Sequence, residues 1–192
     1  MTSSESTLQF GVPQGSVLGP LLFTLYASPI ADIADKHGVN YHLYADDTQI
    51  YVPLEQDCRN QIAQLEKCVQ DISSWMGSNK LILNCDKTDV VVMGTKRQVD
   101  TCNVEEVSID GCSIQLSDSV KNLGCLIDST LTMSDLITDM CKKSYFHLKN
   151  IGKIREYIDK DTAQLLVSTF VMSRLDYCNS LFFSRSSPKV VR

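Results

Sequence analysis

Two adjacent carboxylates are the most chemically suggestive feature of this sequence. Asp46 and Asp47 follow Tyr44 and Ala45 in a short stretch of alternating apolar and polar residues. Like charges side by side repel one another, and a divalent cation offsets that repulsion. Mg²⁺ prefers carboxylate oxygen, and two such ions about 3.5–4 Å apart can stabilise the attacking and leaving oxygens of a phosphoryl transfer. Aspartates also favour turns for conformational reasons alone, and the dipeptide by itself fits that simpler interpretation better.

A glycine-rich loop is the second feature that could bind a ligand. Six consecutive residues form it: Gly11, Val12, Pro13, Gln14, Gly15 and Ser16. Glycine lets a backbone approach a ligand closely, and a loop that feeds a helix presents free N–H groups to anions. The amide of Gln14 can hydrogen-bond to a base edge or a sugar. The loop lacks the Gly-Lys-Ser/Thr run of a P-loop, and by itself it fits an ordinary turn better.

Local patterns predict the elements that position these two candidates. After the loop, apolar residues recur at helical spacing and continue past Pro29: Leu18, Leu21, Leu22, Leu25, Ile30 and Ile33. The alternating stretch 41–52 predicts two short strands around a tight turn at Asp46 and Asp47.

The rest of the chain predicts further helices and short strands. A helix is expected over 62–76, ending near Gly77, because apolar residues there step by three and four. Short strands are expected over 81–83, 90–93 and 123–127. The Asp110-Gly111 pair predicts a hairpin turn between 107–109 and 112–114. Two more helices are expected, one through 137–151 and one that starts at Asp161, three residues before Gln164.

These elements predict an α+β fold, an antiparallel sheet with packed helices, followed by a basic helical segment. The net charge of −5 argues at first sight against a nucleic-acid binder. Residues up to Met140 sum to −11, however, and those from Cys141 onward sum to +6. The boundary between the acidic body and the basic segment is expected near 128–135. An acidic body also fits an ordinary solvated surface.

Cysteine usage and targeting signals narrow the classes of protein further. The eight cysteines form no C-x-x-C pair and the three histidines are scattered, so a zinc cluster is not expected. The first nine residues are polar and show no secretory signal, which argues against a disulfide framework. We therefore expect small, mostly buried thiols in a reducing compartment. No apolar run is long enough to span a bilayer.

Taken together, the loop and the carboxylates resemble the palm of a reverse transcriptase (RNA-directed DNA polymerase). The resemblance is specifically to the non-LTR, LINE-type retrotransposon enzymes of the jockey-like and chicken-repeat groups. It covers nearly the whole chain, from about Phe10 to Leu181. The segments that carry it are Gly11–Phe23, Tyr44–Thr48, Trp75, Asn79–Leu81, Asn84, Lys87-Thr88, Asn122–Gly124 and Ser173–Leu181.

The resemblance implies an activity, its partners and a domain arrangement. The family transfers a nucleotide from a dNTP to a primer 3′ end on an RNA template, with two Mg²⁺ ions, or Mn²⁺ in their place. The partners would be an RNA template, a DNA primer and dNTPs, with no membrane. Residues 1–130 would form a partial palm and 131–192 a thumb-like helical segment. An intracellular location is implied, nucleus or cytoplasm.

The resemblance also assigns roles to individual residues. The template and nascent base pair would lie against residues of the glycine loop and of the hairpin, namely Gly11, Pro13, Gln14, Gly15, Ser16 and Tyr44. Asp46 and Asp47 would bind metal, with Asp46 the main ligand, because adjacent strand residues point to opposite faces. Lys87 would protonate or neutralise the leaving pyrophosphate. Asn122, Leu123 and Gly124 would form the primer grip. Tyr44 also fits a plain strand aromatic, and Lys87 a surface lysine.

Five basic residues of the thumb-like segment would follow the nucleic-acid backbone: Lys142, Lys143, Lys149, Lys153 and Arg155. Each real phosphate contact would add to the salt dependence of binding. Solvated helix faces remain the simpler interpretation for any one of them.

One departure from the family pattern limits the expected activity. The family places a third catalytic aspartate on a strand upstream of the glycine loop, and here only nine residues precede Phe10. Two carboxylates on one hairpin cannot alone hold two metal ions for in-line attack. We therefore expect a C-terminal palm fragment with an open sheet edge, which is incomplete and inactive in isolation. Two alternatives stay open, an inactive retrotransposon remnant that binds nucleic acid or protein at most, and a two-metal nuclease or phosphatase.

Overall fold

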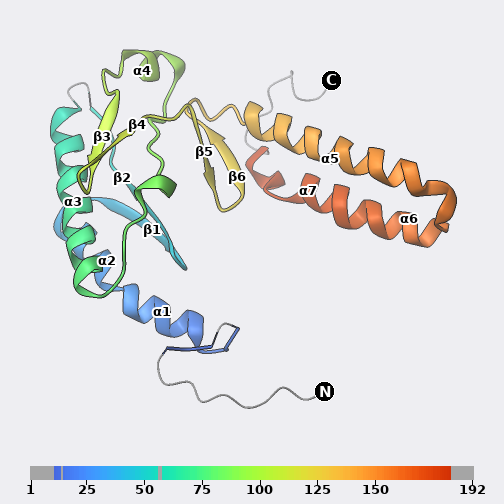
Figure 1. Ribbon diagram of the computed structural model, residues 1–192. Helices are drawn as coiled ribbons and strands as arrows, with labels where there is room; N and C mark the ends of the chain where they lie inside the picture. Colours follow the sequence, from blue (N-terminus) through green and yellow to red (C-terminus); the bar gives the residue numbers. More distant parts are fainter. Residues whose placement is uncertain (1–10, 14, 56–57, 183–192) are drawn as a thin grey trace. The chain divides into compact units, whose positions relative to one another are not determined.

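Short antiparallel hairpins and helices make up the computed structural model, which describes residues 11–13, 15–55 and 58–182 (Figure 1). Its helices are α1 (Gly19–Ala27), α2 (Pro29–Lys36), α3 (Arg59–Ser78), α4 (Lys96–Thr101), α5 (Ser134–Ile154), α6 (Lys160–Val167) and α7 (Ser173–Asp176). Its strands are β1 (Asn40–Tyr44), β2 (Asp47–Tyr51), β3 (Glu106–Ile109), β4 (Cys112–Gln115), β5 (Ser119–Asn122) and β6 (Cys125–Asp128). The predicted α+β class is confirmed.

The contacts group the described residues into two units. The first lies within Met1–Thr88 and Glu106–Gln115, and the second within Asp89–Glu105 and Leu116–Arg192. Each strand pairs only with its hairpin partner among the described residues, so the three sheets leave their edges open there. The contacts place β5 and β6 with the C-terminal helices, and the division into a palm-like part (1–130) and a thumb-like part (131–192) stays a prediction. No helix in the described part of the chain is long and apolar enough to cross a membrane.

The core of the first unit lies between α2, α3 and the β1–β2 hairpin. Its buried residues are Ala27, Ile30, Ala34, Val39, Cys68 and Ile72. The helix predicted over 62–76 is confirmed as α3. The helix predicted to run past Pro29 is instead two helices, because proline has no N–H to donate and suits the first turn of a new helix.

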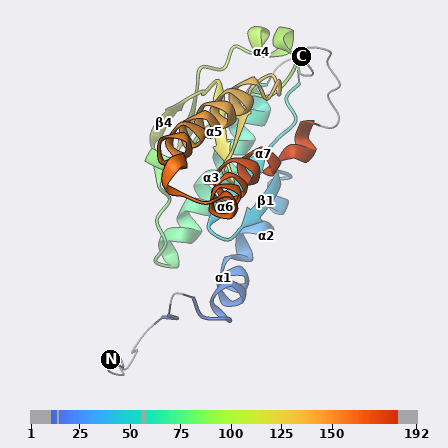
Figure 2. The same ribbon diagram turned by 90° about the vertical axis from the view of Figure 1, so that its right-hand side faces the viewer.

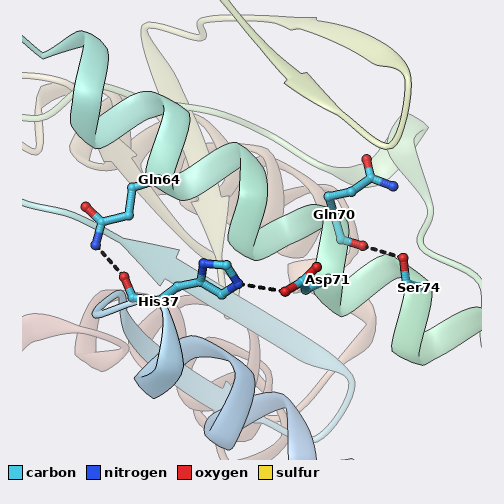
Figure 3. Close-up of polar contacts among 5 residues, drawn as sticks. All are labelled: His37, Gln64, Gln70, Asp71 and Ser74. Atoms are coloured by element: carbon cyan, nitrogen blue, oxygen red, sulfur yellow. Dashed lines mark hydrogen bonds and ion pairs between the residues drawn. The ribbon is translucent and has the colours of Figure 1, made fainter.

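A glycine motif and side-chain hydrogen bonds fix the end of α2 against α3. Gly38 has a φ of 63°, and the N–H of Val39 donates to the carbonyl of Ala34 at 3.0 Å, a Schellman C-cap. Figure 3 shows His37 Nε2 at 2.8 Å from an Asp71 carboxylate oxygen, while Gln64 donates to the His37 carbonyl. The hydrogen bond from His37 lowers the pKa of Asp71 below its ordinary value. These contacts hold the short segment that joins α2 to β1.

The β3–β4 hairpin packs against α3. Val107 and Ile109 are buried, and Glu66 of α3 accepts a hydrogen bond from the Ser108 N–H at 2.8 Å. Asp110 and Gly111 both have positive φ, 51° and 78°, which a type I′ turn requires. The predicted hairpin is confirmed.

Two of the predicted strands are wrong. Residues 81–83 form no strand, and 90–93 contribute one isolated bridge, from Val90 to Leu116. The intervening segment turns instead, because Asn84 caps a 3₁₀ turn by accepting from the Asp86 N–H at 3.1 Å. Such local side-chain bonds compete with strand pairing.

Three smaller expectations also need correction. The strand predicted over 123–127 corresponds to β6, which begins at Cys125 because Leu123 and Gly124 form the hairpin turn before it. Its partner β5 was not predicted. Helix α6 has its N-cap at Asp159 rather than Asp161, since Asp159 accepts from the Thr162 N–H at 2.7 Å. The cysteines are not mostly buried, since only Cys68 and Cys125 are.

In the second unit, the β5–β6 hairpin leads into α5, which lies antiparallel to α6 and α7 (Figure 1, Figure 2). His147 of α5 stacks on Phe170 at a centroid distance of 5.2 Å. The turn between β6 and α5 contains two non-glycine residues with positive φ, Leu131 at 53° and Met133 at 56°. Buried Asp128 holds this turn, and it therefore sets where α5 begins.

Replacing Asp128 with alanine is expected to lower the free energy of unfolding by about 2–3 kcal/mol, measured by urea denaturation. The Asp128 carboxylate accepts from the Thr132 N–H at 2.8 Å and from the Thr130 hydroxyl at 2.9 Å, and both donors would lose their partner. The matched control is Asp118→Ala, which removes an exposed carboxylate.

The effect of Asp128→Ala should depend on pH. Burial alone raises the pKa of Asp128, but the hydrogen bonds from Thr132 and Thr130 outweigh it and hold the pKa below its ordinary value. A lowered pKa stabilises the fold above the unfolded-state pKa of about 4, and this contribution is lost as the pH falls through the folded-state value. The stability gap between wild type and variant should therefore narrow in acid. A gap that widens below about pH 4 would contradict this assignment.

Candidate functional site

The adjacent carboxylates lie at the tip of the β1–β2 hairpin, as predicted. Tyr44 pairs with Asp47, so Ala45 and Asp46 form the two-residue turn. Asp46 is thus a turn residue and Asp47 begins β2. The argument that the two point to opposite faces of a strand does not apply, because only one of them is in a strand. Asp46 as the main metal ligand stays a prediction.

Both carboxylates are exposed, and neither forms an ion pair or hydrogen bond within the part of the chain that the structure describes. Their chemistry suits Mg²⁺, which commonly takes one or two carboxylates and completes its shell with water and substrate phosphate. Among the described residues, no group of three acidic, histidine or cysteine side chains lies close enough to enclose an ion. The hairpin therefore supplies a fitting but partial set of ligands.

The turn that presents Asp46 is strained at Ala45, whose φ is 53°. Primed hairpin turns need a positive φ at the first central position, which glycine adopts without steric penalty. We expect Ala45→Gly to raise the free energy of unfolding by about 1 kcal/mol and Ala45→Val to lower it, measured by urea denaturation. The control is Ala63→Gly on the exposed face of α3, where glycine should destabilise by about 1 kcal/mol. Equal signs for the two glycine variants would contradict a strained turn.

The glycine loop lies immediately before α1, and Gln14 falls outside the described residues. Gly11 and Gly15 have φ values of 81° and 86°, and an added Cβ would meet nothing within 4 Å at either position. These glycines are therefore needed for backbone conformation, and the space beside them is open. The Ser16 hydroxyl accepts from the Gly19 N–H at 3.1 Å and helps to start α1.

A hollow of about 740 Å³ lies beside the loop, and its lining includes Gly11, Pro13 and Gly15 together with Leu22, Phe23 and Tyr26 of α1. Pro13 is part of this lining and is exposed. Tyr26 was not predicted as a site residue; its hydroxyl donates to the Asn79 carbonyl and its ring lies 6.1 Å from that of Trp75. The loop thus borders an open space large enough for a ligand.

The leucine stripe of α1 has the predicted spacing but is exposed to solvent. Leu18, Leu21 and Leu25 are 59%, 57% and 63% exposed. The opposite side of the helix, at Phe23 and Ala27, is the one that packs toward the core. Helical periodicity identified the helix correctly, and tertiary contacts determined which side is buried.

The two remaining predicted groups belong to different units of the chain. Lys87 ends an exposed 3₁₀ turn (Cys85–Lys87) in the first unit. Asn122, Leu123 and Gly124 form the turn region of the β5–β6 hairpin in the second. The Tyr177 hydroxyl donates to the Leu123 carbonyl. Within the described residues, no hydrogen bond or ion pair joins the Asp46 or Asp47 carboxylates to the glycine loop or to Lys87.

A basic and aromatic stripe on α5 extends what the sequence predicted. Its residues, here called the α5 stripe, are Lys142, Tyr145, Phe146, Lys149 and Lys153, all exposed. At about 100° per residue the three lysines fall within about 40° of one another around the helix. Buried Ser144 lies on the opposite side. Lys143, which was predicted with them, is off the stripe and pairs with Asp139 at 2.6 Å. The two aromatic residues were missed, although their spacing from the lysines was visible in the sequence.

Comparison with known proteins identifies the family. A family model described as reverse transcriptase (RNA-dependent DNA polymerase) matches residues 2–127. The chain is 30% identical over 141 residues to the probable RNA-directed DNA polymerase from transposon X-element of Drosophila melanogaster, covering 72% of the chain and 15% of that protein. It is 29% identical over 144 residues to the RNA-directed DNA polymerase from mobile element jockey of the same fly, with the same coverage.

A third relative, the probable RNA-directed DNA polymerase from transposon BS of Drosophila melanogaster, is 25% identical over 155 residues, or 78% of the chain and 17% of that protein. The chain therefore spans about a sixth of the length of these relatives. No solved structure gives a significant match. Since the family model covers well over half of the 192 residues, the chain belongs to the reverse transcriptase (RNA-dependent DNA polymerase) family.

Proposed function

We propose that this chain is part of a mobile-element RNA-directed DNA polymerase, which adds nucleotides from dNTPs to a DNA primer on an RNA template. The observation that carries the proposal is the exposed pair Asp46 and Asp47 at a hairpin tip, in a chain of the reverse transcriptase family. Mg²⁺, with Mn²⁺ as a substitute, would supply Lewis-acid stabilisation of the reacting phosphate oxygens. The nucleus or the cytoplasm is the expected place of action.

The two carboxylates would hold the ions by their charge and by their position. Because both side chains are exposed and have no ion-pair or hydrogen-bond partner among the residues that the structure describes, they can turn toward a metal–nucleotide complex without first breaking such a contact. The remaining ligands would be water and the phosphates of the dNTP. Tyr44, which pairs with Asp47 across the hairpin and is 64% exposed, would then pack beneath the primer end.

The glycine loop would position the template and the incoming base pair. The open space beside Gly11, Pro13 and Gly15 lets a nucleotide approach the backbone closely. The amide of Gln14 would hydrogen-bond to a base edge or a sugar, and Ser16 would hold the loop against α1 through its bond to Gly19. The loop thus orients the template while the hairpin holds the ions.

The other proposed roles concern the leaving group and the duplex. Exposed Lys87 would neutralise charge on the departing pyrophosphate, which a compact mobile cation can do. The turn region Asn122, Leu123 and Gly124 would contact the primer. The α5 stripe would bind phosphates through its lysines and stack on bases or sugars through its aromatics.

A primer-extension assay with an RNA template, a DNA primer and dNTPs tests the proposal. Residues 1–192 and a chain extended upstream by the strand that carries the family's third aspartate are both assayed with Mg²⁺, with Mn²⁺ and with chelator. Metal-dependent incorporation of the templated nucleotide supports the polymerase assignment. In parallel, Mn²⁺ should selectively broaden the amide NMR signals of residues 44–48, a readout that does not need turnover. Binding of Mn²⁺ elsewhere with no effect on this hairpin would argue against the metal site.

A second candidate is a catalytically inactive remnant that only binds nucleic acid or protein. It is favoured by one observation, that the described residues contain no group of three acidic, histidine or cysteine side chains able to hold an ion. This candidate predicts at most weak primer–template binding, without metal-dependent incorporation. Robust incorporation by residues 1–192 would exclude it.

A further inference from the structure

Two cysteines distant in the sequence meet at one end of the β3–β4 hairpin. Cys85 begins the 3₁₀ turn that also carries Lys87, and Cys112 begins β4. The Cys85 thiol lies 3.8 Å from the carbonyl of Ile109, the residue that pairs with Cys112 across the hairpin. The strand register and the contact of Cys85 with Ile109 therefore place the two thiols at the same end of the hairpin.

The two thiols differ in access to solvent. Cys112 is exposed and Cys85 is half-buried. The neighbouring Cys112 thiol, partial burial and the nearby Asp110 and Asp86 raise the pKa of the Cys85 thiol. Cys85 is therefore the less reactive of the pair toward a reagent from solution, since the thiolate is the nucleophile. Cys112 is the sulfur that such a reagent meets first.

We propose that Cys85 and Cys112 form a reversible redox pair, which a small disulfide such as oxidised glutathione converts into an intramolecular disulfide. The Cys112 thiolate attacks one sulfur of glutathione disulfide, so that a mixed disulfide forms and one glutathione thiolate leaves. The Cys85 thiolate then attacks the Cys112 sulfur and expels the second glutathione. The two protons that the cysteines give up are taken up by the two departing glutathione thiolates, the protein loses two electrons, and glutathione disulfide gains them.

The disulfide would tie the turn that carries Lys87 to the β3–β4 hairpin. In the reduced chain this turn is held by Asn84, which accepts from the Asp86 N–H, and by the contact of Cys85 with Ile109. A covalent link restricts the unfolded chain and the local motion of the turn together. The modification is independent of the proposed polymerase activity, because it needs only the two thiols and the oxidant.

Other cysteines of the chain provide internal controls. Cys125 is buried, and burial, with a smaller contribution from the nearby Cys178 thiol, raises its pKa to about 11. Cys141 is exposed on α5, and its thiol forms no hydrogen bond within the described residues. Cys125 and Cys178 should therefore react slowly, while Cys141 should stop at the mixed disulfide with glutathione.

The test is incubation of the folded chain with buffers of varied ratio of reduced to oxidised glutathione, followed by alkylation, proteolysis and peptide mass spectrometry. We expect a Cys85–Cys112 cross-link, a glutathione adduct on Cys141, and Cys125 and Cys178 still free. The Cys85→Ser variant should leave glutathione on Cys112, as on Cys141. The oxidised wild type should unfold several degrees higher than the reduced protein.

Two results would overturn the proposal. One is a stable glutathione adduct on Cys112 of the wild type with no cross-link to Cys85. The other is cross-linking of Cys112 to Cys85 no faster than to Cys141. Both results come from the wild-type chain, so they stand even if a variant fails to fold.

Discussion

Replacing Asp46 with asparagine, in a chain extended upstream by the strand that carries the family's third aspartate, is expected to lower RNA-templated nucleotide incorporation by about a thousandfold while leaving the fold intact. Asparagine keeps the shape of the side chain and removes its charge, and an exposed turn position with no side-chain partner in the described part of the chain tolerates this change. A metal ion contributes several kcal/mol of transition-state stabilisation, and about 4 kcal/mol corresponds to a thousandfold in rate. The same substitution should abolish the Mn²⁺ broadening of residues 44–48.

The matched control is Asp110→Asn, in the turn of the β3–β4 hairpin. That position is also an aspartate in a two-residue turn of the same unit, with a φ of 51° that asparagine adopts readily. It should leave incorporation within about twofold of wild type, since surface substitutions usually change little. Asp47→Asn should reduce incorporation less than Asp46→Asn if Asp46 is the main ligand. Full activity of Asp46→Asn would refute the catalytic role of the hairpin.

The hairpin that carries this prediction was predictable from the sequence because its determinants are local. Alternating apolar and polar residues on both sides of Asp46 and Asp47 define the strands β1 and β2, and the two-residue turn between them sets their register. The same holds for Asp110 and Gly111 between β3 and β4, and for the apolar spacing of α3. In each case residues close in the sequence decide the structure.

Features that depend on distant partners could not be predicted in this way. The strand β5 contains Lys121 and Asn122, which are not typical strand residues, and it exists because β6 pairs with it. Leu18, Leu21 and Leu25 have the spacing of a buried face, yet α1 packs through Phe23 and Ala27 instead. Asn84 diverts its segment into a turn through one side-chain bond. Each outcome depends on a contact that periodicity does not encode.

The candidate site was predictable in composition but not in arrangement. Motif order gave the glycine loop, the carboxylate pair, Lys87 and the segment Asn122–Gly124, and the roles of these residues stay predictions. The two parts of the chain that carry these motifs have opposite net charges, −11 up to Met140 and +6 afterwards. An acidic part suits cation binding, whereas the basic part, concentrated on α5, suits the phosphate backbone. The α5 stripe is the surface on which binding of the basic part to nucleic acid can be tested.

Changing Lys142, Lys149 and Lys153 together to glutamine is expected to weaken binding to an RNA–DNA duplex by about a hundredfold at low salt. Each lysine that neutralises a phosphate releases counterions, so log K falls with log salt by about 0.9 per contact, and the triple variant should flatten that slope by about 2 to 3. The readout is fluorescence anisotropy of a labelled duplex across a salt series. The control triple, Lys36, Lys67 and Lys96 to glutamine, removes equal charge from exposed positions off the stripe and should leave the slope nearly unchanged.

Substitution of the aromatic residues of the α5 stripe distinguishes the contribution of stacking from that of phosphate binding. Phe146 is 62% exposed and contacts His147 edge-on at 5.5 Å, so its ring is presented beside the lysines. Phe146→Ala should weaken binding by about 1–3 kcal/mol without altering the salt slope, because stacking releases no counterions. Lys143→Gln, at a residue paired with Asp139, should change neither quantity appreciably. If the triple lysine variant keeps the wild-type slope, the stripe is only a solvated helix face, and the nucleic-acid contact of the second unit must lie elsewhere.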